Sequence, residues 1–205
     1  MVTGIPEPAG GRQRRAAPPT MSMAVIRPLS EDVVTIGVVL DIPQPHADFL
    51  RQCRADFGDP LAAEIPPHVT LLPPTQVPAD DDRAIQDHLR AVTSVTPPFR
   101  MTLAGTGSFR PISPVVFVTL EDGAEHCADL QRLIRTGPLK RPLEFDYHPH
   151  VTVAHHLDDA AMDRAEAELA GYRSSFDVTG LNFYEHGKDG VWQLRRRFGL
   201  QGEPG

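Results

Sequence analysis

Two copies of one tripeptide, His68-Val69-Thr70 and His150-Val151-Thr152, begin 82 residues apart in this chain of 205 residues. Each copy follows a proline-containing lead-in, Ile65-Pro66-Pro67 for the first and Tyr147-His148-Pro149 for the second. On a β-strand, residues i and i+2 point to the same face. Each tripeptide therefore presents an imidazole and a hydroxyl side by side, while its valine turns toward the core.

The segments around the two copies repeat in the same order. Apolar patterns and turn residues predict a unit of strand, helix, His-Val-Thr strand, helix with an acidic first turn, and strand. The first unit is predicted at residues 33–40, 46–57, 69–72, 80–92 and 99–103, with Pro73-Pro74 ending its second strand. The second is predicted at residues 115–120, 123–134, 150–154, 158–170 and 176–183, and the last strand pairs with 191–198 around Gly187–Gly190. The shift of 82 residues that aligns the histidines also carries Val34 onto Val116.

This duplication predicts the fold class. We expect an α+β protein with pseudo-twofold symmetry, in which antiparallel sheets line a central cleft and helices lie outside. Residues 31–200 would form a single bilobal domain, with lobes at about 31–113 and 114–200. Residues 1–30 are rich in Pro, Gly, Ala and Arg, and we expect a disordered tail there.

Composition excludes several classes of function. A net charge of −7 argues against broad binding to duplex DNA, which needs a basic surface. No apolar run reaches the roughly 18–20 residues that span a bilayer, and no signal peptide is evident. Cys53 and Cys127 are too few for a disulfide framework, and both fall on predicted helices as core or partly buried thiols. We expect a cytoplasmic monomer.

The paired His-x-Thr strands indicate acid–base chemistry. Histidine titrates near pH 6.5, so two histidines in one cleft can serve as a neutral base and a protonated acid. The hydroxyls of Thr70 and Thr152 can donate hydrogen bonds to the oxygens of a reacting phosphate. The catalytic candidates are therefore His68, Thr70, His150 and Thr152, and the chemistry needs no metal or other cofactor.

The chain resembles the two-histidine (2H) phosphoesterase superfamily, also called the 2′-5′ RNA ligase or cyclic-phosphodiesterase-like family. The resemblance rests on Pro67-His68-Val69-Thr70-Leu71 and Pro149-His150-Val151-Thr152-Val153, with support from Gly105–Phe109 and Val115–Leu120, and it covers about residues 32–200. It implies a bilobal fold and a substrate that is a nucleotide or RNA terminus with a 2′,3′-cyclic or related phosphate. It also implies that the four residues of the two motifs are catalytic, and some family members catalyse 2′-5′ RNA ligation.

Further substrate contacts are less strongly indicated. Arg110 follows a Gly/Ser loop and could reach the cleft, while Phe109 and Tyr147 could stack on a base. His148 would border the cleft on the same strand face as His150. Other cations are more typical of a solvated surface: Lys140, Arg141, Arg195 and Arg197.

Three alternatives stay open at this point. For hydrolysis we assign His150 as general base and His68 as general acid, although the residues alone do not distinguish the two, and ligation would exchange the roles. A second possibility is a module that binds a nucleotide or RNA end without turnover. A third is a zinc hydrolase built on the histidines between His148 and His156, a stretch without Cys or acidic ligands at a familiar spacing.

Overall fold

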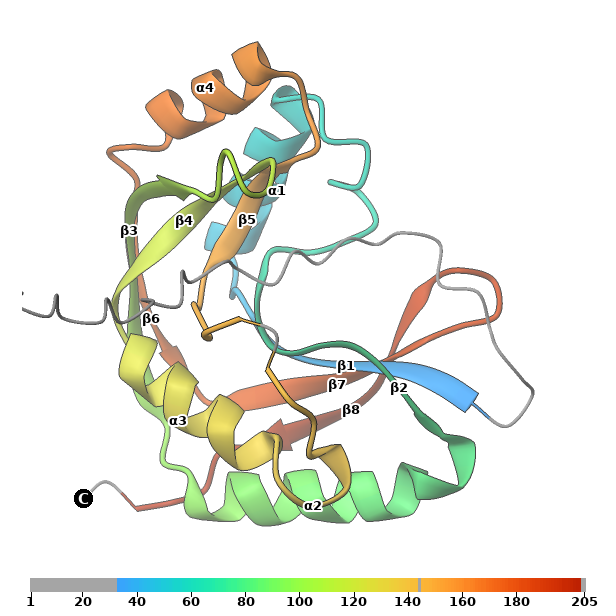
Figure 1. Ribbon diagram of the computed structural model, residues 1–205. Helices are drawn as coiled ribbons and strands as arrows, with labels where there is room; N and C mark the ends of the chain where they lie inside the picture. Colours follow the sequence, from blue (N-terminus) through green and yellow to red (C-terminus); the bar gives the residue numbers. More distant parts are fainter. Residues whose placement is uncertain (1–32, 144, 204–205) are drawn as a thin grey trace, which may run out of the picture.

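The computed structural model describes residues 33–143 and 145–203 (Figure 1). The tail expected at residues 1–30 lies outside the described residues. In the part that is described, no helix is long and apolar enough to cross a membrane.

One curled antiparallel sheet forms the centre of the described fold (Figure 1). Its eight described strands follow the order β6-β3-β4-β5-β2-β1-β7-β8. The α+β class and the antiparallel pairing predicted from the sequence are confirmed. In chain order the strands are β1 Val33–Asp41, β2 His68–Pro78, β3 Phe99–Ser108, β4 Val115–Asp122, β5 Val151–His155, β6 Arg173–Val178, β7 Gly180–His186 and β8 Trp192–Gly199.

The two His-Val-Thr strands are neighbours in the middle of this sheet. β2 pairs with β5 in antiparallel register at Val69 and Val151, which are the middle residues of the two tripeptides. Equivalent residues that face each other across an antiparallel pair are related by a twofold axis between the strands. The predicted pseudo-twofold axis therefore passes between Val69 and Val151.

The two sequence repeats are interleaved in space. On one side of the central pair lie β2, β1, β7 and β8, and on the other lie β5, β4, β3 and β6. Strand β3 thus leaves the first repeat to pair with β4, while β7 leaves the second repeat to pair with β1. Each half of the sheet therefore contains strands from both repeats, because β3 pairs with β4, the strand that follows it in the chain.

Two helices pack on each half of the curled sheet. They are α1 His46–Asp56, α2 Asp82–Val95, α3 Ala124–Ile134 and α4 Asp159–Glu168, and each predicted helix agrees with its observed bounds to within three residues. α1 and α4 pack around β5 and β4, whereas α3 and α2 pack on β2 and β8 (Figure 1). The first helix of each repeat therefore packs on the His-Val-Thr strand of the other repeat: α1 packs on β5, and α3 packs on β2.

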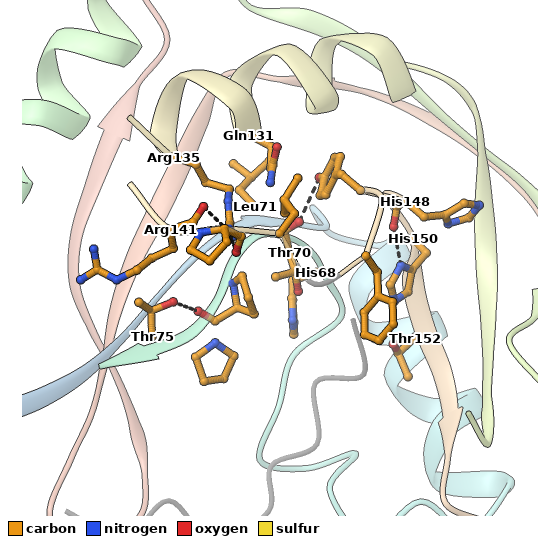
Figure 2. A pocket seen from close by; sticks show the side chains of 16 residues that line it. His68, Thr70, Leu71, Thr75, Gln131, Arg135, Arg141, His148, His150 and Thr152 are labelled. Atoms are coloured by element: carbon orange, nitrogen blue, oxygen red, sulfur yellow. Dashed lines mark hydrogen bonds between the residues drawn. The ribbon is translucent and has the colours of Figure 1, made fainter. Parts of the chain in front are cut away.

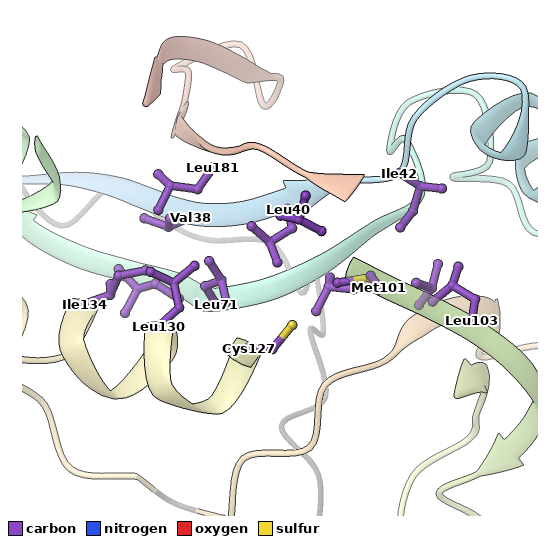
Figure 3. Close-up of a cluster of buried hydrophobic side chains, with 14 of the residues drawn as sticks. Val38, Leu40, Ile42, Leu71, Met101, Leu103, Cys127, Leu130, Ile134 and Leu181 are labelled. Carbon is purple, nitrogen blue, oxygen red and sulfur yellow. The ribbon is translucent and has the colours of Figure 1, made fainter. Parts of the chain in front are cut away.

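Helix periodicity explains how these helices bury one face. In α2, Ile85, Leu89 and Val92 recur at helical spacing and are buried. In α3, Cys127, Leu130 and Ile134 point toward Leu71 of β2 in a continuous apolar core (Figure 3). Burial raises the pKa of the Cys127 thiol to about 12, so it packs as a small apolar side chain. Both cysteines are free, with Cys127 buried and Cys53 partly buried.

Strand β2 runs past Pro73 and Pro74, where the sequence predicts its end. The pairing of β2 with β1 shifts register at this point, between Val38 opposite Leu72 and Ile36 opposite Thr75. On its other side, β2 pairs with β5 at Val69. Proline lacks an amide donor and is tolerated at such bulges and on unpaired edges. The two prolines predict the end of the strand, whereas the pairing of β2 with β1 continues beyond them.

The predicted strand at residues 176–183 is also corrected. It is divided at Thr179 into β6, which is the first strand of the sheet order, and β7, which lies in the other half of the sheet next to β8. β6 pairs with β3, and β7 pairs with both β1 and β8. The hairpin of β7 and β8 around Gly187–Gly190 is as predicted. The apolar pattern continues through the division because both segments bury one face.

Candidate active site

Four side chains of the two motifs gather on one face of the central strand pair. Val69 and Val151 are fully buried, so the residues on either side of each point to the opposite face. The antiparallel register sets His68 across from Thr152 and His150 across from Thr70. All four line one cavity of about 470 Å³ (Figure 2). The geometry therefore brings together the four residues that the sequence singled out.

Each histidine is oriented by the same hydrogen bond. Nδ1 of His68 donates to the carbonyl oxygen of Pro66 at 2.7 Å, and Nδ1 of His150 donates to that of His148 at 2.7 Å. A carbonyl oxygen can only accept, so Nδ1 carries the proton in both rings. This leaves Nε2 of each ring to accept a proton from a ligand, or to donate one when the ring is charged. The lead-in before each motif thus sets the tautomer of its histidine.

The cavity keeps its histidines neutral in the free protein. Burial lowers the pKa of His150 to about 4, with smaller effects of His148 and His68 in the same direction. Burial likewise lowers the pKa of His68, and a neighbouring Arg54 adds to this effect. His148 also has a lowered pKa, mainly through burial. At pH 7 these shifts favour the uncharged imidazole in all three residues, most strongly in His150.

Two aromatic rings cover His150. The centroid of Phe109 lies 5.0 Å from that of His150 and 5.5 Å from that of His148, both in edge-on geometry. Phe117 of β4 lies 5.1 Å from His150 and 4.2 Å from Phe109. Phe109, expected to stack on a base, packs on the site histidines and is not among the residues that line the cavity.

Arg110 lies outside the cavity lining, away from the substrate contact that the sequence suggested. Its guanidinium bonds carboxylates of α4, with Nη1 2.7 Å from Asp163 and Nη2 2.9 Å from Glu166. Its backbone and side-chain nitrogens also donate to Ser108 Oγ at 3.2 Å. Arg110 therefore fastens the segment that carries Phe109 to α4.

Tyr147 and His148 both line the cavity, but they are held differently. The hydroxyl of Tyr147 donates to the backbone carbonyl of Thr70 at 2.9 Å, and burial raises the pKa of this hydroxyl well above its usual value. This hydrogen bond connects the segment just before β5 to β2 (Figure 2). His148 is exposed at the rim.

Part of the cavity wall was not predicted from the sequence. Arg135 and Gln131 come from α3 and its end, and Thr75 comes from the continuation of β2. Arg141 was noted only as a surface cation, yet it lines the same cavity. The full lining consists of His68, Thr70, Leu71, Pro73, Pro74, Thr75, Gln131, Arg135, Arg141, Pro142, Leu143, Phe145, Tyr147, His148, His150 and Thr152. No local sequence pattern marks these residues, because α3 packs on β2, a strand of the other repeat.

The histidines beyond the second motif do not assemble a metal-binding group. The rings of His155 and His156 lie 4.2 Å apart. Within residues 33–143 and 145–203, no three His, Cys, Asp or Glu side chains are placed to hold a metal ion.

Comparison with known proteins identifies the family. The model of the 2′-5′ RNA ligase superfamily matches residues 42–190. A Bacillus thuringiensis protein, provisionally named a phosphoesterase, is 30% identical over 169 residues, which cover 80% of this chain and 96% of the relative. A Bacillus cytotoxicus protein with the same provisional name is 33% identical over 125 residues, covering 61% of this chain and 72% of the relative. The chain belongs to the 2′-5′ RNA ligase superfamily, the 2H phosphoesterases.

Solved structures show the same fold. LigT of E. coli in complex with NADP+ has a TM-score of 0.65 at 20% identity, covering 83% of this chain and 99% of LigT. LigT has also been solved with 3′-AMP, with a TM-score of 0.62 at 18% identity over 82% of this chain and 98% of LigT. TT0787 of Thermus thermophilus has a TM-score of 0.54 at 18% identity, covering 83% of this chain and all of TT0787.

Proposed function

We propose that this protein is a phosphoesterase that hydrolyses 2′,3′-cyclic phosphates of nucleotides or RNA ends by histidine acid–base catalysis, without a metal. One observation carries the proposal: His68 and His150 are related by the axis between β2 and β5, and their Nε2 atoms are available to the same cavity. An in-line displacement at phosphorus needs a proton acceptor and a proton donor on opposite sides of the reacting atom. A twofold pair of imidazoles meets that need.

In the proposed reaction, Nε2 of His150 takes a proton from water, and the water oxygen forms a bond to phosphorus. The bond from phosphorus to one ribose oxygen breaks, and that oxygen takes a proton from Nε2 of His68. The product is a phosphomonoester, and the two histidines end with exchanged protonation states. Hydroxyls of Thr70 and Thr152 donate to the non-bridging oxygens, where negative charge must be held.

Binding of the anionic substrate would favour the protonated imidazole that the general acid requires. Both histidines are neutral in the free cavity at pH 7 because burial disfavours the imidazolium. A bound phosphodiester anion favours protonation of a nearby imidazole, so one proton enters with the substrate. His150 suits the base role because its pKa of about 4 keeps it unprotonated at neutral pH. In ligation of a 2′-5′ bond, the 5′-hydroxyl of a second RNA end would take the place of water, and the proton transfers at the two histidines would follow the same scheme.

The comparisons support a nucleotide as the ligand. LigT has been solved with 3′-AMP, with ATP and with NADP+. Each of these molecules carries a phosphate attached to a nucleoside. The proposed substrate has the same two parts.

Replacing either histidine tests the proposal. His68→Ala and His150→Ala should each lower kcat/KM on a nucleoside 2′,3′-cyclic phosphate by about 10²–10⁴-fold, which is the usual contribution of a positioned acid or base. His126→Ala is the matched control, because His126 is exposed and stacks on Phe99 outside the cavity. Full activity in the double variant would refute the catalytic roles.

Two further measurements separate the alternatives. Full activity in the presence of a chelator is expected, and loss of activity that returns with zinc would favour a zinc hydrolase. Tight binding of a cyclic nucleotide with no product from RNA ends or mononucleotides would identify a binding module.

A further inference from the structure

The cavity extends from the histidines in one direction. Beyond His68 and Thr70, its wall follows β2 to Thr75 and reaches Arg135 and Arg141 (Figure 2). On the opposite side, His150 is closed off by the rings of Phe109 and Phe117 described above. A ligand whose phosphate lies between the histidines therefore has space to continue toward the two arginines.

The far end of the cavity is cationic. Arg135 and Arg141 are the only formally charged side chains among the described residues that line it, and none of those residues is Asp or Glu. The hydrogen bonds of both guanidinium groups go to backbone carbonyls. Arg135 Nη2 donates to Arg141 O at 3.0 Å and to Pro142 O at 2.7 Å, and Arg141 Nη1 donates to Lys140 O at 2.8 Å. No carboxylate in the described part of the chain forms an ion pair with either arginine.

This arrangement differs from that of other arginines in the protein. Arg110 and Arg132, for example, each pair with carboxylates of a neighbouring helix or of their own helix. The pKa of Arg135 is lowered, first because the group is partly buried and second because the positive charge of Arg141 repels its own. An anion between them would offset that repulsion and the loss of water, and guanidinium groups match phosphate oxygens with paired hydrogen bonds.

We propose that Arg135 and Arg141 form a second phosphate subsite, which selects substrates that carry a 5′-phosphate in addition to the cyclic phosphate. The proposal rests on the proposed function, since it takes the cyclic phosphate to lie at His68 and His150. Leu143 and Phe145 are exposed apolar side chains that also line the cavity, and they can contact the nucleoside between the two phosphates. An RNA end and a free 5′-phosphorylated cyclic nucleotide share this chemistry.

The test compares one nucleoside 2′,3′-cyclic phosphate with and without a 5′-phosphate. The wild-type protein should favour the 5′-phosphorylated form by about 10- to 100-fold in kcat/KM, because hydrogen bonds between charged groups have that effect. Arg141→Gln should bring this ratio close to one, and Arg135→Lys should retain part of it. A dinucleotide that ends in a cyclic phosphate should have a higher kcat/KM than both mononucleotides if the natural substrate is an RNA end.

Matched controls keep the result clear. Arg132 is an exposed arginine of α3, the helix that Arg135 follows, and it does not line the cavity. Arg132→Gln should therefore leave unchanged both the activity and the preference for the 5′-phosphorylated substrate. Arg141→Gln is preferred to Arg135→Gln as the main variant, because the guanidinium of Arg141 donates to the carbonyl oxygen of its neighbour Lys140, whereas that of Arg135 bonds two carbonyls of the cavity wall. A wild-type ratio of one, or an equal loss on both substrates in Arg141→Gln, would overturn the subsite.

Binding separates failure of the subsite from failure of the proposed function. If neither substrate is hydrolysed, the proposed function fails, and calorimetry with a nucleoside 3′-monophosphate and a 3′,5′-bisphosphate still tests the subsite. The bisphosphate should bind about 10- to 100-fold more tightly than the monophosphate to the wild-type protein. Equal affinities, or a difference that survives in Arg141→Gln, would overturn it.

Discussion

Truncating Phe109 to alanine should release the imidazole of His150 from its low-pKa environment. The Phe109 ring meets that of His150 edge-on at 5.0 Å, and Phe117 provides the second covering ring at 5.1 Å. The fall of the His150 pKa from 6.5 to about 4 has burial as its first cause. This fall corresponds to about 3 kcal/mol of differential interaction between the two protonation states. Because Phe109 is one of two covering rings, we expect the Phe109→Ala pKa to reach about 5.

The same shift predicts how stability depends on pH. In the unfolded chain His150 has its ordinary pKa, which lies above the value of about 4 in the folded protein. As the pH falls from 6.5 toward 4, the unfolded state binds a proton that the folded state does not, so stability decreases. The contribution of His150 to this loss is about 3 kcal/mol, complete below pH 4. In Phe109→Ala the loss over this window should be smaller by about 1 kcal/mol.

Two measurements check this prediction. NMR titration of the His150 ring proton gives its pKa directly, and urea unfolding at pH 7 and pH 4.5 gives the change in the free energy of unfolding. Phe99→Ala is a suitable control, because Phe99 stacks on His126 and should leave the His150 titration unchanged. A pKa that remains at about 4 in Phe109→Ala would refute the role of this ring in keeping water from His150.

The remaining predictions concern residues that support the site. Arg110→Gln removes the bonds to α4, and because these groups are partly exposed we expect a loss of about 1 kcal/mol in urea unfolding, with an upward shift of the His150 pKa by NMR. An unchanged titration would show that Arg110 does not position Phe109. Arg54→Ala leaves Asp59 buried without its partner and should cost about 3–5 kcal/mol, whereas Arg51→Ala breaks an exposed pair and should leave Tm unchanged. Tyr147→Phe removes the bond to the Thr70 carbonyl and should lower stability by about 1 kcal/mol. Its kcat should fall more than its KM rises if the bond positions the site, and a change confined to stability would argue against that role.

Local pattern was sufficient for the four helices and for the centre of the candidate site. The alternation in His68-Val69-Thr70 and His150-Val151-Thr152 requires that imidazole and hydroxyl share a face, and both valines are fully buried. Helical spacing of apolar residues located all four helices because their buried faces recur every three to four residues. The duplicated order also predicted the pseudo-twofold axis, since equivalent strands that bury equivalent faces can pair across it.

Contacts between segments distant in the sequence determined the extent of β2 and the surroundings of the arginines. Pro73 and Pro74 signal a stop, yet β2 continues, because its partner β1 is distant in sequence. Arg110 and Arg141 both lie outside the helices and strands, and nothing in their local sequence distinguishes their surroundings. The carboxylates of α4 draw Arg110 away from the cavity, while the end of α3 holds the backbone of Arg141 at the cavity wall. The sequence thus determined which side chains share a strand face, because that depends on backbone periodicity. Only the tertiary structure decided which charges meet which partners, because that depends on how distant segments pack.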